Sequence, residues 1–236
     1  MPITYYTEYS AGTAVVASSS QATTADDYLV KAKDLLVVKG KENELIYLAN
    51  KSIALRESAT AFWLRARARQ ATGDIRGAVQ DWSRAAELEP DTPWVHFNLG
   101  NIKSDYGDRT GAISAYGKAI SLLELIQSRH GGDWESKCFY GQGCLELLGD
   151  ALFYRAKNLA ITGDTRAALA DYSRVISLAP NDGMRASAFY YRAEEYFRLG
   201  NLNSARADCR QAVNLTPEEL LSKSRSMLLI AQDSAT

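Results

Sequence analysis

The chain repeats a pattern of apolar, small and polar positions, and the stretch from Ala59 to Thr92 shows this pattern most clearly. Two runs of helix-forming residues flank a Thr-Gly-Asp turn, and Pro90 closes the second run. A glycine in such a turn can adopt the left-handed conformation that ends one helix, and the aspartate after it can start the next helix. The stretch therefore predicts two short helices that pack as a hairpin.

The turn glycines recur at similar intervals along the chain. They are separated by 33, 34, 56 and 37 residues, and 56 equals one period of 34 plus an insertion of 22. Every one except the first is followed by Asp or Asn, as expected at the start of a helix. Self-similarity at such a period predicts a repeat protein. The glycines are Gly40, Gly73, Gly107, Gly163 and Gly200.

Small and aromatic residues keep fixed distances from these glycines. Nine residues after three of the glycines stand Trp82, Tyr116 and Tyr172, with Cys209 at the fourth place. Small residues let antiparallel helices approach closely, and the aromatic ring fills the space beside them. The small residues stand seven before the glycine (Ala66, Gly100, Ala156, Ala193), five after it (Ala78, Ala112, Ala168, Ala205) and twelve after it (Ala85, Ala119, Val175, Ala212).

These positions resemble the tetratricopeptide repeat, a 34-residue helix-turn-helix unit. The resemblance implies an all-α fold, a right-handed α-solenoid of helix-turn-helix repeats with a C-terminal capping helix. Glu124 replaces the closing proline in the second repeat. The matching ranges, which together cover 136 residues, are 59–92, 93–126, 149–182 and 186–219.

Both ends of the predicted solenoid, which takes residues 25–232, depart from the repeat pattern. Residues 26–58 lack the small residues and are interpreted as a degenerate first repeat that caps the stack. Thr216 followed by Pro217 and glutamate is a typical helix start, so residues 218–232 are predicted to form the capping helix.

The N-terminal segment, residues 1–24, is expected to be a flexible tail. It is rich in Ser, Thr and Ala and carries one charged residue, Glu8. Three tyrosines, Tyr5, Tyr6 and Tyr9, interrupt this composition. Whether they are incidental, or whether the tail folds back into an aromatic groove of its own protein, stays open.

The insertion, residues 127–148, is expected to lengthen two helices into a projecting hairpin. The preceding helix is predicted to continue to about Arg129, and a new helix is predicted from Trp134 to Leu148 after an Asp133 N-cap. A plain elongation and a partner-binding protrusion are both consistent with this pattern, and so is occupation of the groove by the insertion.

Composition and charge argue against several functional classes. The formal net charge is -1, so no global field collects nucleic acid. No apolar run approaches the roughly 18 residues that span a bilayer, and no basic, apolar signal sequence opens the chain. We therefore expect no nucleic-acid partner, no membrane insertion and a cytoplasmic location.

The sequence offers no set of residues that predicts catalysis. It lacks a phosphate-binding loop, a nucleophile elbow and metal-ligand spacings, so we expect no enzyme activity, no cofactor and no metal. The cysteines Cys138, Cys144 and Cys209 are interpreted as small apolar residues on helix faces. The acidic residues are interpreted as solvated; among them are Glu87, Glu89, Asp171, Glu194 and Glu195.

The resemblance implies a binding site, because the first helices of tetratricopeptide repeats line a concave groove that holds an extended or helical peptide. Phe97, Phe153 and Tyr190 also face this side but are the first expected to pack between helices instead. The predicted groove residues are Trp63, Arg67, Trp94, Asn98, Asn101, Tyr154, Lys157, Tyr191, Glu194 and Arg198.

One family subtype, which clamps the carboxylate tail of heat-shock chaperones, is disfavoured. Asn98 fits that clamp, but Asp150 stands where a cation is expected and would repel a carboxylate.

We therefore predict a non-catalytic adaptor, or an assembly or chaperone-like scaffold, that binds a peptide or partner protein in the groove. The alternative is a structural subunit that self-associates as a homo-oligomer or docks in a larger complex through its insertion and terminal helices.

Overall fold

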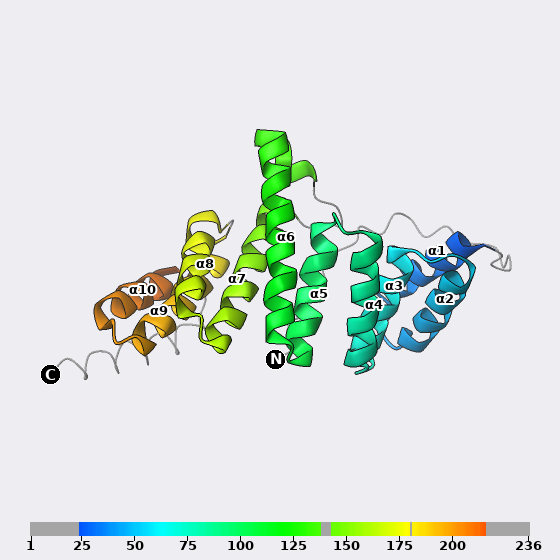
Figure 1. Ribbon diagram of the computed structural model, residues 1–236, viewed down its shortest axis with the longest axis horizontal. Coiled ribbons are helices and arrows are strands. Elements are labelled where there is room, and N and C mark those ends of the chain that lie inside the picture. Colours follow the sequence, from blue (N-terminus) through cyan, green and yellow to red (C-terminus); the bar gives the residue numbers. More distant parts are fainter. Residues whose placement is uncertain (1–23, 138–142, 180, 216–236) are drawn as a thin grey trace. The chain divides into compact units, whose positions relative to one another are not determined.

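The computed structural model describes residues 24–137, 143–179 and 181–215, and every regular element in these ranges is helical (Figure 1). The all-α fold with helices in sequential hairpins is therefore confirmed. The elements are α1 (Ala25–Leu35), α2 (Glu42–Leu55), α3 (Ala59–Ala71), α4 (Ile75–Leu88), α5 (Pro93–Tyr106), α6 (Arg109–His130), the 3-10 helix η1 (Gly131–Lys137), α7 (Cys144–Thr162), α8 (Thr165–Leu178), α9 (Asp182–Arg198) and α10 (Leu202–Leu215).

The helices form two compact units, the first with α1 to α5 and the second with α6 to α10 and η1. Within each unit, nearly every helix packs against the next one along the chain. The first helices of successive hairpins also touch, as α1 touches α3 and α7 touches α9. Such packing between neighbours in sequence is typical of a solenoid, in which each repeat buries its apolar face against adjacent repeats.

The turn glycines adopt the predicted left-handed conformation. Their φ angles lie between 73° and 92°, a region that costs glycine little because it has no Cβ atom. The residue after the glycine then caps the next helix: the Asp74 carboxylate accepts from the Gly77 N–H at 2.9 Å, and Asp164 accepts from the Ala167 N–H at 3.1 Å. The predicted helix stop and start signals are thus confirmed at these turns.

The core of each hairpin follows the predicted offsets. Ala66, Ala78 and Ala85 are fully buried in the first unit, and Trp82 is only 1 % exposed beside them. In the second unit Tyr172 takes the same position and is also 1 % exposed. Small residues in the contact and one large ring beside it therefore produce the close helix packing, as expected.

In the described residues, three bidentate Arg–Asp ion pairs with buried aspartates, which the sequence analysis did not anticipate, each join the two helices of a hairpin. In each pair, two guanidinium nitrogens donate to both carboxylate oxygens over 2.6–2.9 Å. The aspartates are 2–5 % exposed, so the interpretation of Asp171 as a solvated residue is wrong. The pairs are Arg65–Asp81 between α3 and α4, Arg155–Asp171 between α7 and α8, and Arg192–Asp208 between α9 and α10.

The insertion differs from its prediction. Helix α6 continues to His130, close to the expected end, and Figure 1 shows it rising beyond α7 and α8. Residues 131–137 then form η1 instead of an α-helix, and α7 begins only at Cys144, so the predicted helix start at Trp134 is wrong. Gly131, with φ 54°, follows the end of α6, and the Trp134 side chain is buried.

Two predicted segments and one cysteine lie outside the described residues. They are most of the N-terminal tail (residues 1–23), the capping helix (218–232) and Cys138. Cys144 is disulfide-bonded, so its interpretation as a plain apolar residue is wrong, whereas Cys209 is a free buried thiol.

Candidate functional site

A cluster of three tryptophans lies in the first unit. Trp94 on α5 packs edge-on against Trp63 of α3 and Trp82 of α4, with ring centroids 5.4 Å apart in both pairs. Trp63 is 4 % and Trp82 is 1 % exposed, whereas Trp94 is half-buried. The outermost ring of the cluster therefore belongs to Trp94, and the other two rings support it from within the unit.

Two amide side chains continue the surface from Trp94 along α5. Asn98 stands one turn further on, and its side-chain NH₂ donates to the Trp94 carbonyl at 2.8 Å. Asn101 stands about one turn beyond Asn98, and both asparagines are half-buried. We call Trp94, Asn98 and Asn101 the tryptophan patch. It combines one supported aromatic ring with amides that can both donate and accept hydrogen bonds.

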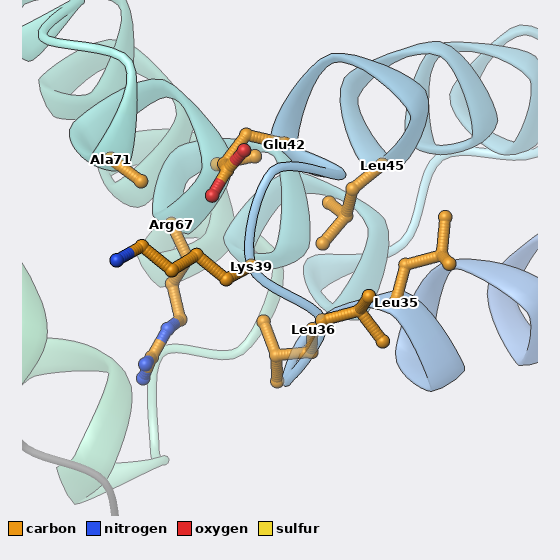
Figure 2. A pocket seen from close by; sticks show the side chains of 9 residues that line it. Leu35, Leu36, Lys39, Glu42, Leu45, Arg67 and Ala71 are labelled. Carbon is orange, nitrogen blue, oxygen red and sulfur yellow. The ribbon is translucent and has the colours of Figure 1, made fainter.

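Arg67, one turn after Trp63 on α3, lines a pocket between α3 and the α1–α2 turn (Figure 2). In Figure 2 the leucine side chains lie on one side, and the charged ends of Lys39 and Arg67 lie on the other. Glu42 accepts from the Gly40 N–H at 3.1 Å, and such backbone N–H donors lower the pKa of its carboxyl. The pocket is lined by Leu35, Leu36, Val38, Lys39, Glu42, Leu45, Arg67, Ala68 and Ala71.

The second unit carries a larger aromatic cluster, which we call the tyrosine cluster. Its rings come from α6, α7, α8 and α9 and form a connected series with centroids 5.2–6.3 Å apart. Tyr116, Tyr172 and Tyr190 are buried, while the other three rings are half-buried. The members are Tyr116, Phe153, Tyr154, Tyr172, Tyr190 and Tyr191.

Lys157 places its ammonium group over three rings of this cluster. Its Nζ lies 5.0 Å from the Tyr191 centroid, 5.8 Å from Phe153 and 5.9 Å from Tyr154. Cations at this distance are attracted by the negative face of an aromatic ring. The rings of α7 and α9 are therefore bridged by a half-buried lysine.

Burial, helped by Glu194 of α9, keeps two hydroxyls of the cluster protonated. The Tyr190 hydroxyl donates to Glu194 at 2.6 Å, and burial together with this bond raises the pKa of Tyr190 well above its ordinary value. Burial, followed by the charge of Glu194, also raises the pKa of Tyr191. Both hydroxyls thus stay protonated at neutral pH and can act as hydrogen-bond donors.

Arg198 and Glu195 form a further contact at the end of α9. The guanidinium lies 3.0 Å from Glu195 and donates to the Ala160 carbonyl of α7 at 3.4 Å. Arg198 is exposed, but Glu195 is 2 % exposed, so the interpretation of Glu195 as a solvated residue is wrong. Glu87, by contrast, is exposed as expected.

The predicted groove residues thus separate into two surfaces. The first unit holds Trp63, Arg67, Trp94, Asn98 and Asn101, and only Trp63 among them is buried. The second unit holds the other five on α7 and α9, and all of them retain exposed surface. Phe97 and Tyr190, expected to pack between helices, are 4 % and 9 % exposed. The role in partner binding stays a prediction for every groove residue. The groove residues are Trp63, Arg67, Trp94, Asn98, Asn101, Tyr154, Lys157, Tyr191, Glu194 and Arg198.

Neither a group of metal ligands nor a membrane-spanning helix is found among the described residues. Within them, no group of three or more His, Cys, Asp or Glu side chains is placed to hold a metal ion. None of the helices in the described ranges is both long and apolar enough to cross a membrane.

Comparison with known proteins identifies the repeat. A family model described as "TPR repeat" matches residues 66–107, and a model described as "Tetratricopeptide repeat" matches residues 186–219. None of the curated proteins matches the chain.

Several solved structures share the fold at low sequence identity. YrrB, a TPR protein with an unusual peptide-binding site, is 18% identical with a TM-score of 0.67, over 86% of this chain and 91% of its own. MamA from Desulfovibrio magneticus RS-1 is 12% identical with a TM-score of 0.61, over 83% and 97%. Pseudomonas aeruginosa pilF is 12% identical with a TM-score of 0.61, over 88% of each chain.

Proposed function

Because the chain belongs to the tetratricopeptide repeat proteins, we propose that it is a non-catalytic adaptor that binds a peptide segment of a partner protein. Proteins of this family generally mediate protein–protein interactions. The residues that would do so here are those of the tryptophan patch in the first unit and of the tyrosine cluster in the second. An assembly or chaperone-like role is one form of the same activity.

The tyrosine cluster is the observation that supports this proposal most strongly. Tyr154 and Tyr191 keep part of their surface exposed while Phe153 and Tyr172 hold their rings in place. A partner therefore meets aromatic rings whose conformational freedom is already restricted, which lowers the entropy cost of binding. Buried Tyr, Trp and Arg contacts dominate many interfaces, at about 2 kcal/mol or more for each hot spot.

The charges around the cluster favour a peptide that alternates apolar and polar side chains. Apolar side chains of the partner would cover Tyr154 and Tyr191. Lys157 and Arg198 would attract acidic groups, and Glu194 would attract basic groups, so charge would fix the register of the peptide more than its affinity. At the tryptophan patch, the side-chain amides of Asn98 and Asn101 would form hydrogen bonds with a peptide backbone.

Peptides selected from a random display library on the purified protein test this proposal. Tyr191→Ala should weaken the selected peptides by about 30-fold, which corresponds to roughly 2 kcal/mol. Tyr106→Ala is the matched control, because Tyr106 at the end of α5 is 54% exposed and belongs to neither surface. Isothermal titration gives the affinities, and circular dichroism checks the fold. Equal losses in the two variants would refute a role for the tyrosine cluster.

A second candidate function, docking or self-association through the first hairpin, is favoured by a separate observation. Helices α1 and α2 and their turn leave five large apolar side chains 44–65% exposed. Several exposed apolar side chains on one hairpin can mark a site where another protein docks. Sedimentation across protein concentrations tests this candidate, and a monomer at every concentration rules out self-association. The side chains are Val30, Val37, Val38, Tyr47 and Leu55.

The cytoplasmic location stays a prediction, and one observation points the other way. Disulfides persist in oxidising compartments and are rare in the cytosol, whereas Cys144 is disulfide-bonded. Cell fractionation combined with thiol labelling before lysis decides between these compartments.

A further inference from the structure

We infer that the N-terminal segment of the same chain, residues 1–23, binds the tryptophan patch and competes there with partner peptides. This inference rests on the proposed function, because it assigns a second ligand to one of the proposed binding surfaces. It assigns a regulatory role to a segment whose composition gives it no core of its own.

The tryptophan patch is complementary to an aromatic or apolar ligand that has hydrogen-bonding groups beside it. The Trp94 ring is held in place by Trp63 and Trp82, each 5.4 Å away, so it offers a pre-ordered surface for stacking. Asn98 and Asn101 are positioned on the same helix to bind hydroxyl or backbone groups. Aromatic pairs contribute about 0.5–1.5 kcal/mol beyond the area that they bury.

The N-terminal segment carries matching groups close together. Tyr5, Tyr6 and Tyr9 supply rings with hydroxyl groups, and Glu8 is the only charged side chain before Thr24. In the same unit, the pocket of Figure 2 is lined by two cations, Lys39 and Arg67, and one acidic residue, Glu42, so its net charge is opposite in sign to Glu8. The segment is therefore complementary to the first unit in both ring chemistry and charge.

The attachment point of the segment makes this contact accessible. Thr24 and Asp27 form a capping box at the start of α1, with bonds of 2.9 and 3.1 Å, so the segment enters the first unit at a fixed point. The 15 residues from Tyr9 to Thr24 reach about 50 Å when extended, and a coil of this length spans roughly 20 Å. A compact unit of about 85 residues has a radius of gyration near 12 Å. The linker is therefore long enough for the tyrosines to reach surfaces across the first unit.

Attachment also raises the effective concentration of the tyrosines at the patch. A short linker gives an effective concentration on the order of 1 mM, so even a ligand with a Kd of about 0.1 mM occupies the patch for most of the time. A partner peptide must then displace the segment, which weakens its apparent affinity by about tenfold.

A labelled synthetic peptide with the sequence of residues 2–14 tests this competition on full-length chains. It should bind Tyr5→Ser/Tyr6→Ser/Tyr9→Ser about tenfold more tightly than the unchanged chain, because the variant leaves the patch open. The control, Ser18→Ala/Ser19→Ala/Ser20→Ala, keeps the tyrosines and should bind like the unchanged chain. Equal affinity for the triple serine variant and the unchanged chain would overturn the inference.

Further variants locate the contact. Trp94→Ala in the triple serine background should abolish binding of the synthetic peptide, and Asn101→Ala should weaken it without removing a ring from the core. Binding that survives both changes places the segment elsewhere, for example on the exposed face of α1 and α2, and overturns the inference. A fold-difference that grows with protein concentration indicates a segment from a second copy and also overturns it.

The library-selected peptides separate this inference from the proposed function. If they lose affinity on Trp94→Ala but bind the unchanged chain and the triple serine variant equally, the proposed function stands and the inference fails. If they ignore Trp94 while the synthetic peptide needs it, the segment binds the patch but the inferred competition with partner peptides is overturned.

Discussion

Removal of the Asp171 carboxylate tests whether the buried ion pairs hold the hairpins together. Asp171 on α8 is 4 % exposed and accepts two hydrogen bonds of 2.7 Å from Arg155 on α7. Asp171→Ala leaves the guanidinium without its charge partner in a largely buried place. Breaking a buried pair in this way costs about 3–5 kcal/mol, and we expect the lower end because the Arg155 side chain is 23% exposed.

A second repeat of the same chain supplies the compensating variant. The Arg–Asp positions lie eight residues before and eight residues after the turn glycine. At Gly107 they hold Leu99 and Ala115, which are 8 % and 6 % exposed. The double variant Arg155→Leu/Asp171→Ala places the same two apolar residue types at these positions. Replacement of a buried ion pair by apolar residues is often neutral, so we expect the double variant within about 1 kcal/mol of the unchanged protein.

Amide hydrogen exchange under increasing urea measures the effect where it occurs. Solenoids can open locally, so the exchange of α7 and α8 is more informative than one global unfolding curve. The control is Arg174→Ala, which breaks an ion pair with Glu124 whose side chains are 41% and 45% exposed and should cost less than about 1 kcal/mol. The reasoning is refuted if the double variant is as unstable as Asp171→Ala, or if the control is equally damaging.

Three further predictions concern the second unit. Gly163→Ala should destabilise the α7–α8 turn by about 1–2 kcal/mol because of its φ of 89°. Gly117→Ala inside α6 should stabilise by up to about 1 kcal/mol, because the added Cβ meets only Arg155 Nη1 at 3.6 Å; urea denaturation measures both. Burial raises the pKa of Cys209 to about 11 from 9.0, so this thiol contributes stability that is present below pH 9 and is lost as the pH rises toward 11. Urea midpoints between pH 8 and pH 11 should therefore fall more steeply for the unchanged protein than for Cys209→Ala; parallel slopes would contradict this.

The hairpins could be predicted because their signals are local. A turn glycine, a capping aspartate and the small residues at fixed offsets all act within one or two helices. These signals repeat, so errors at one position are corrected by the others. Backbone conformation at Gly73 and burial of Ala78 thus followed from the sequence alone.

The ion pairs could not be recognised in the same way, because each partner alone has the appearance of a surface charge. Arg155 and Asp171 are 16 residues apart on different helices, so their contact depends on how α7 packs against α8. The signal that would have found them is the repetition of Arg and Asp at the same offsets from Gly73, Gly163 and Gly200.

The insertion and the site were predictable only in part. The end of α6 followed from its apolar pattern, but the 3-10 helix after it depends on Gly131 and on burial of Trp134, which no periodic pattern indicates. The offsets placed the predicted groove residues on α3, α5, α7 and α9, whereas their role in binding stays a prediction. They did not show that Trp63 is covered by its neighbours, because exposure depends on packing between helices.

The most direct test of the central claim is to map a library-selected peptide on the protein by hydrogen exchange. If the first helices of the hairpins carry the binding surfaces, protection on binding should be concentrated in α3, α5, α7 and α9. Protection concentrated in the second helices α4, α6, α8 and α10, with α5, α7 and α9 unchanged, would contradict the account.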